Sequence, residues 1–226
     1  MGTLLSEVSI AQGPLDSFLD RLEMGSKKRC LSVLTLNPEI FVLGFRPELY
    51  NYITADGIGI VLAFRLFLKQ AVNRMTGIDL SFALFERIEK VYLLGSTVDV
   101  LNVAKVSLES RYSQLTVCCQ DGFFDSSDFN AIGAAVAQFD PDLVLVGMGH
   151  PLQEQVIFHL KPMLNRGVVI GVGGVIDVLG GQKKWAPEWV RWVGLEWLFS
   201  LIVQPRRFFR LCRWVFPFFR RCLMNS

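Results

Sequence analysis

The sequence predicts an α/β fold, a Rossmann-like and mostly parallel sheet flanked by helices. Short apolar runs rich in β-branched residues alternate along the chain with longer segments of helical period, and this alternation is typical of βαβ units. Turns containing glycine or proline follow these runs, as expected where buried strands end. With 226 residues, the chain is long enough for one well-buried domain of this kind and an appendage.

The predicted elements alternate from residue 31 onward. The strands are predicted at 31–36, 90–94, 115–119, 142–147 and 168–172. The helices are predicted at about 57–70, 97–111, 126–139, 154–165 and 187–203. Ligands of open parallel sheets bind outside the carboxyl ends of the strands. We therefore expect the functional residues in the turns that follow the predicted strands.

The C-terminal end of the chain differs in charge from the rest. Residues 204–226 hold six arginines and no acidic residue, a charge of +6 that leaves −4 for residues 1–203. Hydrophobic residues make up 51% of the chain and its mean hydropathy is +0.38. This composition excludes a disordered chain and indicates that some apolar surface meets more than its own core. We divide the chain into an α/β domain at 1–200 and a basic amphipathic appendage at 201–226.

Residues 206–216 follow a helical period. Their arginines gather on one face, apolar residues such as Phe208 and Val215 lie opposite, and Pro217 is predicted to interrupt the helix. Such a helix can lie in the interface of an anionic bilayer. It can also pack on the domain with its arginines in water, and the sequence leaves both interpretations open.

The sequence predicts neither a metal site nor a secreted or membrane-spanning protein. Its five cysteines lack a metal-ligand spacing and are interpreted as reduced thiols. Asp140-Pro141-Asp142 is a DxD, a pattern that holds a metal in many sugar transferases, but it precedes a predicted strand and is interpreted as a turn. The N-terminus lacks a secretion signal, and no run of about 18 uncharged apolar residues is present.

Asp56 and Arg74 are candidate functional residues beside glycine-containing turns. Asp56 lies in Ala55-Asp56-Gly57-Ile58-Gly59 ahead of an apolar helix. It could cap that helix, or act as a general base while the helix start offers amides to an anion. Arg74 lies beside the turn at Gly77 and could clamp a phosphate or remain a solvated surface residue.

Two later turns are glycine-rich. In Gly147-Met148-Gly149-His150-Pro151-Leu152-Gln153-Glu154, the last two side chains could reach a ligand, or Glu154 could only complement the helix dipole. Gly171-Val172-Gly173-Gly174 lacks the final glycine of a dinucleotide fingerprint and follows the last strand. We interpret it as a turn whose backbone approaches a phosphate or sugar, not as an NAD site.

Taken in order, these pieces resemble the WecG/TagA/CpsF glycosyltransferase family, also called glycosyltransferase family 26. The order of the motifs covers nearly the whole chain. They are Thr35-Leu36-Asn37-Pro38-Glu39, Ala55-Asp56-Gly57-Ile58-Gly59, Arg74-Met75-Thr76-Gly77-Ile78-Asp79-Leu80, Val91-Tyr92-Leu93-Leu94-Gly95, Asp121-Gly122-Phe123-Phe124, Gly149-His150-Pro151-Leu152-Gln153-Glu154, Gly171-Val172-Gly173-Gly174 and the segment 185–207.

The resemblance implies transfer of a sugar, with inversion and without a metal or cofactor, from a UDP-sugar to a polyprenyl-diphosphate-linked saccharide. The reaction would serve exopolysaccharide or envelope glycan synthesis at the inner face of a bacterial plasma membrane. The resemblance makes Asp56 the general base and places Thr35 at the reacting centre. It assigns substrate binding to Asn37, Arg74, Gly149, Gln153, Gly173, Arg207 and Arg210. We expect an anionic membrane surface as a partner through the C-terminal helix, and no nucleic acid.

Three departures from the family pattern bear on activity. The segment between Asn37 and Asp56 is several residues shorter than usual, His150 and Leu152 replace a small residue and a lysine, and Ser200 stands where arginine is common. The missing cations favour an alternative, a catalytically inactive scaffold or regulator that binds nucleotide sugars. An apolar surface that does not meet a membrane could also join two copies of the chain.

Overall fold

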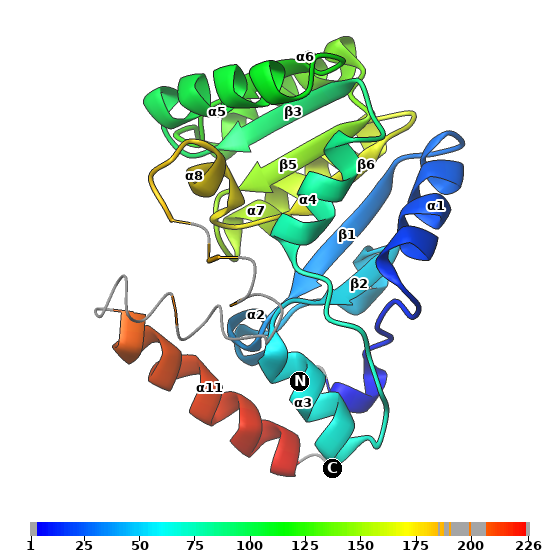
Figure 1. Ribbon diagram of the computed structural model, residues 1–226, viewed down its shortest axis with the longest axis vertical. Helices are drawn as coiled ribbons and strands as arrows, with labels where there is room; N and C mark the ends of the chain where they lie inside the picture. Colours follow the sequence, from blue (N-terminus) through cyan, green and yellow to red (C-terminus); the bar gives the residue numbers. More distant parts are fainter. Residues whose placement is uncertain (1–3, 185, 188–189, 191–198, 200–206, 225–226) are drawn as a thin grey trace.

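A computed structural model describes residues 4–184, 186–187, 190, 199 and 207–224 of the chain. Its centre is a six-stranded parallel sheet with the strand order β2-β1-β6-β5-β3-β4 (Figure 1). The strands are β1 (Leu31–Leu36), β2 (Tyr52–Ala55), β3 (Lys90–Gly95), β4 (Thr116–Gln120), β5 (Leu143–Gly147) and β6 (Val168–Gly171). The predicted α/β class with a parallel sheet is confirmed.

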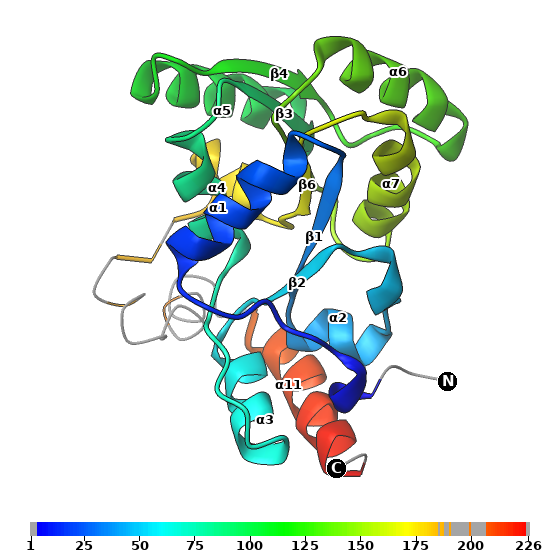
Figure 2. The ribbon, with the colours of Figure 1, turned by 90° about the vertical axis from the view of Figure 1, so that its right-hand side faces the viewer.

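Helices cover both faces of the sheet (Figure 2). One layer holds α1 (Leu15–Ser26), α4 (Gly77–Phe85), α5 (Val98–Arg111) and α8 (Val175–Leu179). The other holds α2 (Pro38–Leu43), α3 (Ile58–Phe67), α6 (Phe129–Phe139), α7 (Leu152–Leu160) and α11 (Arg207–Met224). Short 3-10 turns lie at Leu5–Glu7, Pro47–Leu49, Ser126–Asp128 and Lys161–Met163.

The two helical layers bury separate cores because strand side chains alternate between the faces of the sheet. In β3, Val91 and Leu93 join the core under α1, α4 and α5, whereas Tyr92 and Leu94 join the core under α6 and α7. All six residues of β1 are buried. A strand buried on both faces must be apolar throughout, which is why β1 reads in the sequence as a continuous apolar run.

The five predicted strands are confirmed to within one residue at each end, and the helices α3, α5, α6 and α7 fall within or close to their predicted ranges. The sequence pattern missed β2, α1, α2, α4 and α8. β2 is one of the two edge strands, has four residues and includes a polar threonine, so it lacks the apolar run that marks the inner strands. The helix predicted at 187–203 and the domain boundary at 200 fall on residues that lie almost wholly outside the described part.

The C-terminal helix differs from its prediction. Pro217 was expected to interrupt it, but α11 continues through this residue to Met224. A proline inside a helix costs about 3 kcal/mol because it removes one backbone hydrogen bond and crowds the preceding turn. Here the following turns are held by burial of Phe218 and Cys222, and fully burying one such apolar side chain contributes about 1.5–3 kcal/mol.

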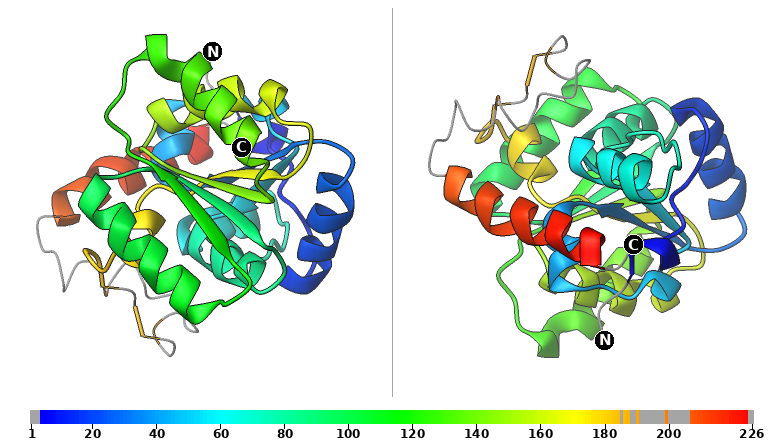
Figure 3. Two further views of the ribbon diagram at one scale, coloured as in Figure 1. Left: turned by 90° about the horizontal axis from the view of Figure 1, so that it is seen from above. Right: turned by 90° about the horizontal axis from the view of Figure 1, so that it is seen from below.

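Helix α11 is docked on α2 and α3, across the lower face of the molecule (Figure 3, right). The rings of Phe218 and Phe41 meet edge to face with their centroids 5.2 Å apart. Arg221 donates a hydrogen bond of 3.1 Å to the carbonyl oxygen of Val42, near the end of α2. The C-terminal part of α11 therefore packs on the domain. Among the described residues, no helix is both long and apolar enough to cross a membrane.

We predict that Phe218→Ala undocks α11. The truncation empties a fully buried site, which costs about 3–5 kcal/mol for phenylalanine. Cys222 reports on the docking, since burial raises the pKa of its thiol to about 11 and keeps it protonated near neutral pH. Peptide mapping after alkylation at pH 8 should show faster labelling of Cys222 in this variant. Phe216→Ala, in the exposed part of the same helix, is the control, and equal labelling rates in the two variants would contradict the packing described here.

Candidate active site at the carboxyl edge of the sheet

The candidate site lies where the carboxyl ends of β1, β2, β5 and β6 meet. The chain leaves β1 toward β2 on one side, and it leaves β6 toward α8, which contacts α5, on the other. Such a reversal opens a crevice at the carboxyl edge of a parallel sheet. In Figure 1 the arrowheads of β3 and β5 point toward the side where α8 and the beginning of α11 lie.

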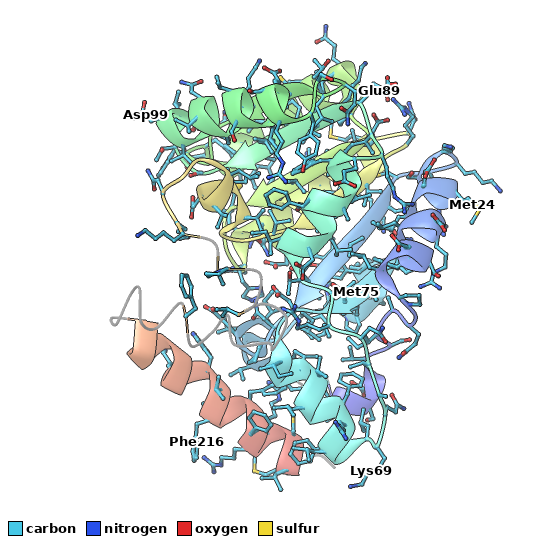
Figure 4. All side chains as sticks on the ribbon, in the orientation of Figure 1. Met24, Lys69, Met75, Glu89, Asp99 and Phe216 are labelled. Carbon is cyan, nitrogen blue, oxygen red and sulfur yellow. The ribbon has the colours of Figure 1, made fainter. Side chains whose placement is uncertain are left out.

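Backbone pairing brings three predicted site residues to one corner of this edge. The N–H of Asp56 donates a hydrogen bond of 2.8 Å to the carbonyl oxygen of Leu36, so Asp56 lies beside Asn37, the next residue. Arg74 pairs with Ala55 in an isolated parallel bridge, and the N–H of Met75 donates to the Ala55 carbonyl at 3.0 Å. Figure 4 labels Met75 in this central region. A carboxylate, an amide and a guanidinium thus share one corner.

Two of these three side chains also have a local role. Asn37 caps α2, since its Oδ1 accepts a hydrogen bond of 3.0 Å from the N–H of Ile40. The cap engages Oδ1 and not the NH2 group. Arg74 lies 3.9 Å from Asp79, a long ion pair, while Asp79 accepts a closer hydrogen bond of 2.6 Å from the Thr76 hydroxyl.

Two glycines follow Asp56, one in the turn and one in the first turn of α3. Gly57 has a φ of 94°, in the left-handed region that other residues rarely adopt, and it precedes the first residue of α3. A Cβ on Gly59 would lie 3.1 Å from the Pro38 ring, so a larger residue would push α3 away from α2. The positive end of the α3 dipole therefore begins two residues after Asp56.

Thr35 is a buried structural link under the site. Its hydroxyl donates a hydrogen bond of 2.7 Å to the carbonyl oxygen of Gly171, the last residue of β6. Gly77, at the start of α4, packs against it, because a Cβ there would lie 3.4 Å from Thr35 Cγ2. Thr35 thereby joins the ends of β1 and β6 to α4. Its predicted catalytic role stays a prediction.

Gln153 links the two glycine-rich turns. It is only 3% exposed, its Oε1 accepts a 3.2 Å hydrogen bond from the N–H of Gly173, and its Nε2 donates one of 3.0 Å to Glu154 Oε1. Both ends of the amide therefore have protein partners. Gly173 has a φ of 52°, and a Cβ added to it would meet no described atom within 4 Å. The N–H of Gly173 is already used by Gln153.

A buried carboxylate, for which the sequence analysis left two roles open, lies beside this link. Glu154 Oε2 is 3.0 Å from His150 Nδ1, but neither atom has a hydrogen bond of regular geometry within the described chain. Burial, and then the charge of Glu154, raises the pKa of the Tyr50 hydroxyl far above its ordinary value. The sequence showed a Glu in the first helical turn, but no pattern revealed that the side chain points inward.

A second polar cluster lies at the end of β3. The Ser96 hydroxyl donates a hydrogen bond of 2.8 Å to Asp177 Oδ1, and Lys183 pairs with Asp177 Oδ2. Ser96 has a φ of 61°, in the left-handed region, so the turn after β3 is strained. These residues come from three separate segments, and the sequence offered only the Gly95-Ser96 turn as a signal.

The DxD pattern lies away from this site, as predicted. Asp142 Oδ2 accepts hydrogen bonds from the N–H groups of Glu89 and Lys90, at the amino ends of the strands. Arg166 binds both aspartates and holds the pKa of the Asp140 carboxyl below its ordinary value. The motif is therefore a turn held by ion pairs. Among the described residues, no group of three or more His, Cys, Asp or Glu is placed to hold a metal ion.

The remaining predicted site residues have different positions. Gly149 lies in the exposed turn after β5 with a φ of 74°, and its carbonyl oxygen accepts a hydrogen bond from the N–H of Gln153. Arg207 and Arg210 lie in the first turns of α11, while their side chains are outside the described part. Six predicted residues are thus joined at the carboxyl edge through contacts with one another or with neighbouring strands: Thr35, Asn37, Asp56, Arg74, Gln153 and Gly173.

Comparison with known proteins shows the family of the chain. The model of the glycosyl transferase WecG/TagA/CpsF family matches residues 3–226. The chain belongs to this family. It is accordingly a glycosyltransferase of cell envelope glycan synthesis, and the family resemblance read from the motifs is confirmed.

Two curated relatives carry the same activity name. A Bacillus subtilis (strain 168) protein is 31% identical over 211 residues, which are 87% of this chain and 82% of the relative. A Staphylococcus aureus (strain NCTC 8325 / PS 47) protein is 32% identical over 192 residues, 80% of this chain and 75% of the relative. Both are named N-acetylglucosaminyldiphosphoundecaprenol N-acetyl-beta-D-mannosaminyltransferase.

We predict that Gln153→Leu destabilises the protein by about 1–3 kcal/mol. The substitution keeps the volume but leaves the Gly173 N–H and a Glu154 oxygen unpaired in a buried site. Urea denaturation would measure the loss. Gln155→Leu is the matched control, since Gln155 is exposed on the same helix. Equal stability of the two variants would show that the link between the two turns contributes nothing to the free energy of unfolding.

Proposed function

We propose that this enzyme transfers a sugar from a UDP-sugar to a polyprenyl-diphosphate-linked saccharide, with inversion and without a metal. The names of the relatives support this acceptor class, because both state a diphosphoundecaprenol-linked sugar as acceptor. They also support an N-acetylmannosaminyl donor as the first to be tested. The observation that carries the proposal is the corner where Asp56, Asn37 and Arg74 lie next to one another through backbone pairing.

Asp56 is the general base of the proposed reaction. It removes the proton from an acceptor hydroxyl as that oxygen attacks the anomeric carbon of the donor. The new glycosidic C–O bond forms as the bond from the anomeric carbon to the UDP oxygen breaks, and a single displacement of this kind inverts the configuration. One carboxylate suffices for such a step, since no covalent enzyme intermediate has to form and break.

The leaving UDP gains negative charge, which the site must stabilise. Arg74 lies at the same corner, where it pairs with Ala55 in the isolated bridge. The N-terminus of α3 begins two residues after Asp56. A guanidinium and helix amides can together bind a diphosphate without a metal ion. Arg207 and Arg210 are proposed to add cations from the start of α11.

The other predicted residues support this corner. Asn37 offers its NH2 group to the sugar, since its Oδ1 is used by the α2 cap. Thr35 ties β1 to β6 beneath the reacting centre. Gln153, whose amide is engaged at both ends, is proposed to place the Gly173 backbone as well as to line the site.

A donor screen tests the function. Purified protein is mixed with a short, soluble prenyl-diphosphate-linked N-acetylglucosamine, several UDP-sugars and EDTA, and release of UDP is measured. We expect release with one donor only in the presence of acceptor. UDP binding without turnover for every donor and acceptor would overturn the proposal and favour the inactive scaffold. Activity abolished by EDTA and restored by a divalent ion would overturn metal independence.

We predict that Asp56→Asn lowers kcat by about 10²–10⁴-fold, the usual contribution of a general base. UDP affinity should change little, because the asparagine keeps the size of the side chain. Asp99→Asn, an exposed aspartate at the start of α5, is the control and should retain activity. Near-normal turnover by the Asp56 variant would remove Asp56 from the mechanism.

Membrane binding through the C-terminal helix is a second part of the proposal. Phe216 is 73% exposed and therefore is not covered by the domain, although most of the following turn is docked. Arg213 and Arg220 are exposed on the same helix. Exposed arginines and a large exposed aromatic ring are typical of a helix at an anionic bilayer interface. The enzyme would then act as a peripheral protein of the inner membrane face, where its lipid-linked acceptor lies.

We predict that Arg213→Gln/Arg220→Gln weakens binding to vesicles that contain phosphatidylglycerol. Each basic residue near such a surface contributes about 1 kcal/mol, so the pair should lower the partition coefficient by roughly 30-fold. Cosedimentation at low salt measures this loss. Lys27→Gln/Lys28→Gln, at exposed sites beyond α1, is the control. Equal losses in both double variants would show that net charge, and not the helix, governs binding.

A further inference from the structure

Helix α3 carries an exposed stripe that neither its packing nor the catalytic proposal explains. Leu62 and Leu66 are 39% and 54% exposed, one turn apart. Arg65 lies between them and is exposed, and exposed Lys69 follows the end of the helix. The opposite side of α3, with Ile60 and Phe64, is buried in the core. The exposed stripe therefore combines leucines with basic residues and contains no acid.

The described part of α11 has the same combination on its exposed side. Arg213, Phe216, Arg220, Leu223 and Met224 are all exposed. At about 100° per residue these five positions fall within one third of the helix circumference. The buried positions Phe218 and Cys222 lie on the other side, against α2 and α3. This stripe is again apolar and basic, with no acidic residue.

The two stripes belong to neighbouring helices at one end of the molecule. α11 contacts α3, and the ring centroids of Phe67 and Phe219 are 6.3 Å apart at their junction. Figure 1 shows both helices at the end opposite α5 and α6, and Figure 3, right, shows them on the lower face. The labelled side chains of Phe216 and Lys69 both lie at this end in Figure 4.

We propose that α3 and α11 form one surface that docks on an anionic lipid bilayer, with α3 as a membrane contact in addition to the C-terminal helix. The surface is basic and apolar, and this combination matches an anionic bilayer. Leu62, Leu66, Phe216 and Leu223 suit the acyl boundary, while the interleaved arginines can extend their charged ends to lipid phosphates. A partner of neutral or basic chemistry would not match four exposed cations without a single acid.

This placement has a consequence for the reaction and rests on the proposed function. α3 begins one residue after Gly57, so Asp56 lies at the end of a ten-residue helix that itself touches the bilayer. A helix of this length spans about 15 Å. Docking through α3 would therefore hold the catalytic carboxylate within about one helix length of the lipid phosphates. The diphosphate of a polyprenyl acceptor lies at that level of the membrane.

The test compares two double variants of the full-length protein. Leu62→Ser/Leu66→Ser removes the apolar part of the α3 stripe. Val103→Ser/Val106→Ser is the matched control, because these valines are also exposed on a helix but lie on α5, at the other end of the molecule. Binding is measured by cosedimentation with phosphatidylglycerol-containing vesicles, and circular dichroism confirms that both variants are folded.

We expect the α3 variant to lose at least about tenfold in partition coefficient, because two leucines no longer enter the apolar layer, and the α5 variant to match the unmodified protein. Equal binding of the α3 variant and the unmodified protein overturns the proposal. A changed sedimentation coefficient in the absence of lipid, with unchanged vesicle binding, would identify the surface as an interface between two copies of the chain and would also overturn it.

The soluble-acceptor assay separates this inference from the proposed function. With an acceptor that needs no membrane, the α3 variant should release UDP at the normal rate, since Leu62 and Leu66 lie outside the proposed site. Absence of turnover by the unmodified protein would overturn the proposed function alone, because vesicle binding is measured without any reaction. Loss of turnover by the α3 variant with the soluble acceptor would show that its leucines act on the site itself, and would overturn their assignment to the membrane.

Discussion

The structure depends on the hydrogen-bonded register of β1 with its two neighbours. β1 is buried along its whole length, pairs with β2 on one side and with β6 on the other, and the pairing continues past the strand end to the Asp56 N–H and the Leu36 carbonyl. A shift of one residue would turn every side chain of the strand to the opposite face. The same register therefore builds both cores and sets the neighbours of Asp56.

Several buried polar contacts extend this constraint to the helices. Thr35 ties β1 to β6 from below, and Gln153 ties the start of α7 to the turn after β6. Each contact pairs a side chain with a backbone group near the carboxyl ends of the strands, and a buried polar group costs more when unpaired than the bond contributes when formed. The turns that surround the proposed site are thus held by contacts with the interior of the protein.

Helix α11 shows how tertiary packing can overrule local preference. Proline in a helix interior is unfavourable, and this preference alone predicts that the helix ends at Pro217. The residues beyond it find a buried place on α2 and α3, so the helix continues. Its remaining surface keeps Phe216 exposed, so packing on the domain accounts for only one side of the helix.

The sequence by itself determined the fold class, the inner strands and the turns that hold Asn37, Asp56, Arg74 and Gln153, because buried strands and their turns leave periodic apolar and glycine patterns. It also determined the family, since the order of the motifs is a property of the chain alone. Only the tertiary structure decided that β2 exists as an edge strand, that Glu154 points inward beside His150, that Asp177 meets Ser96, and that α3 presents leucines beside α11. These contacts join residues distant in sequence or depend on which side of a helix is covered, and no local pattern encodes either.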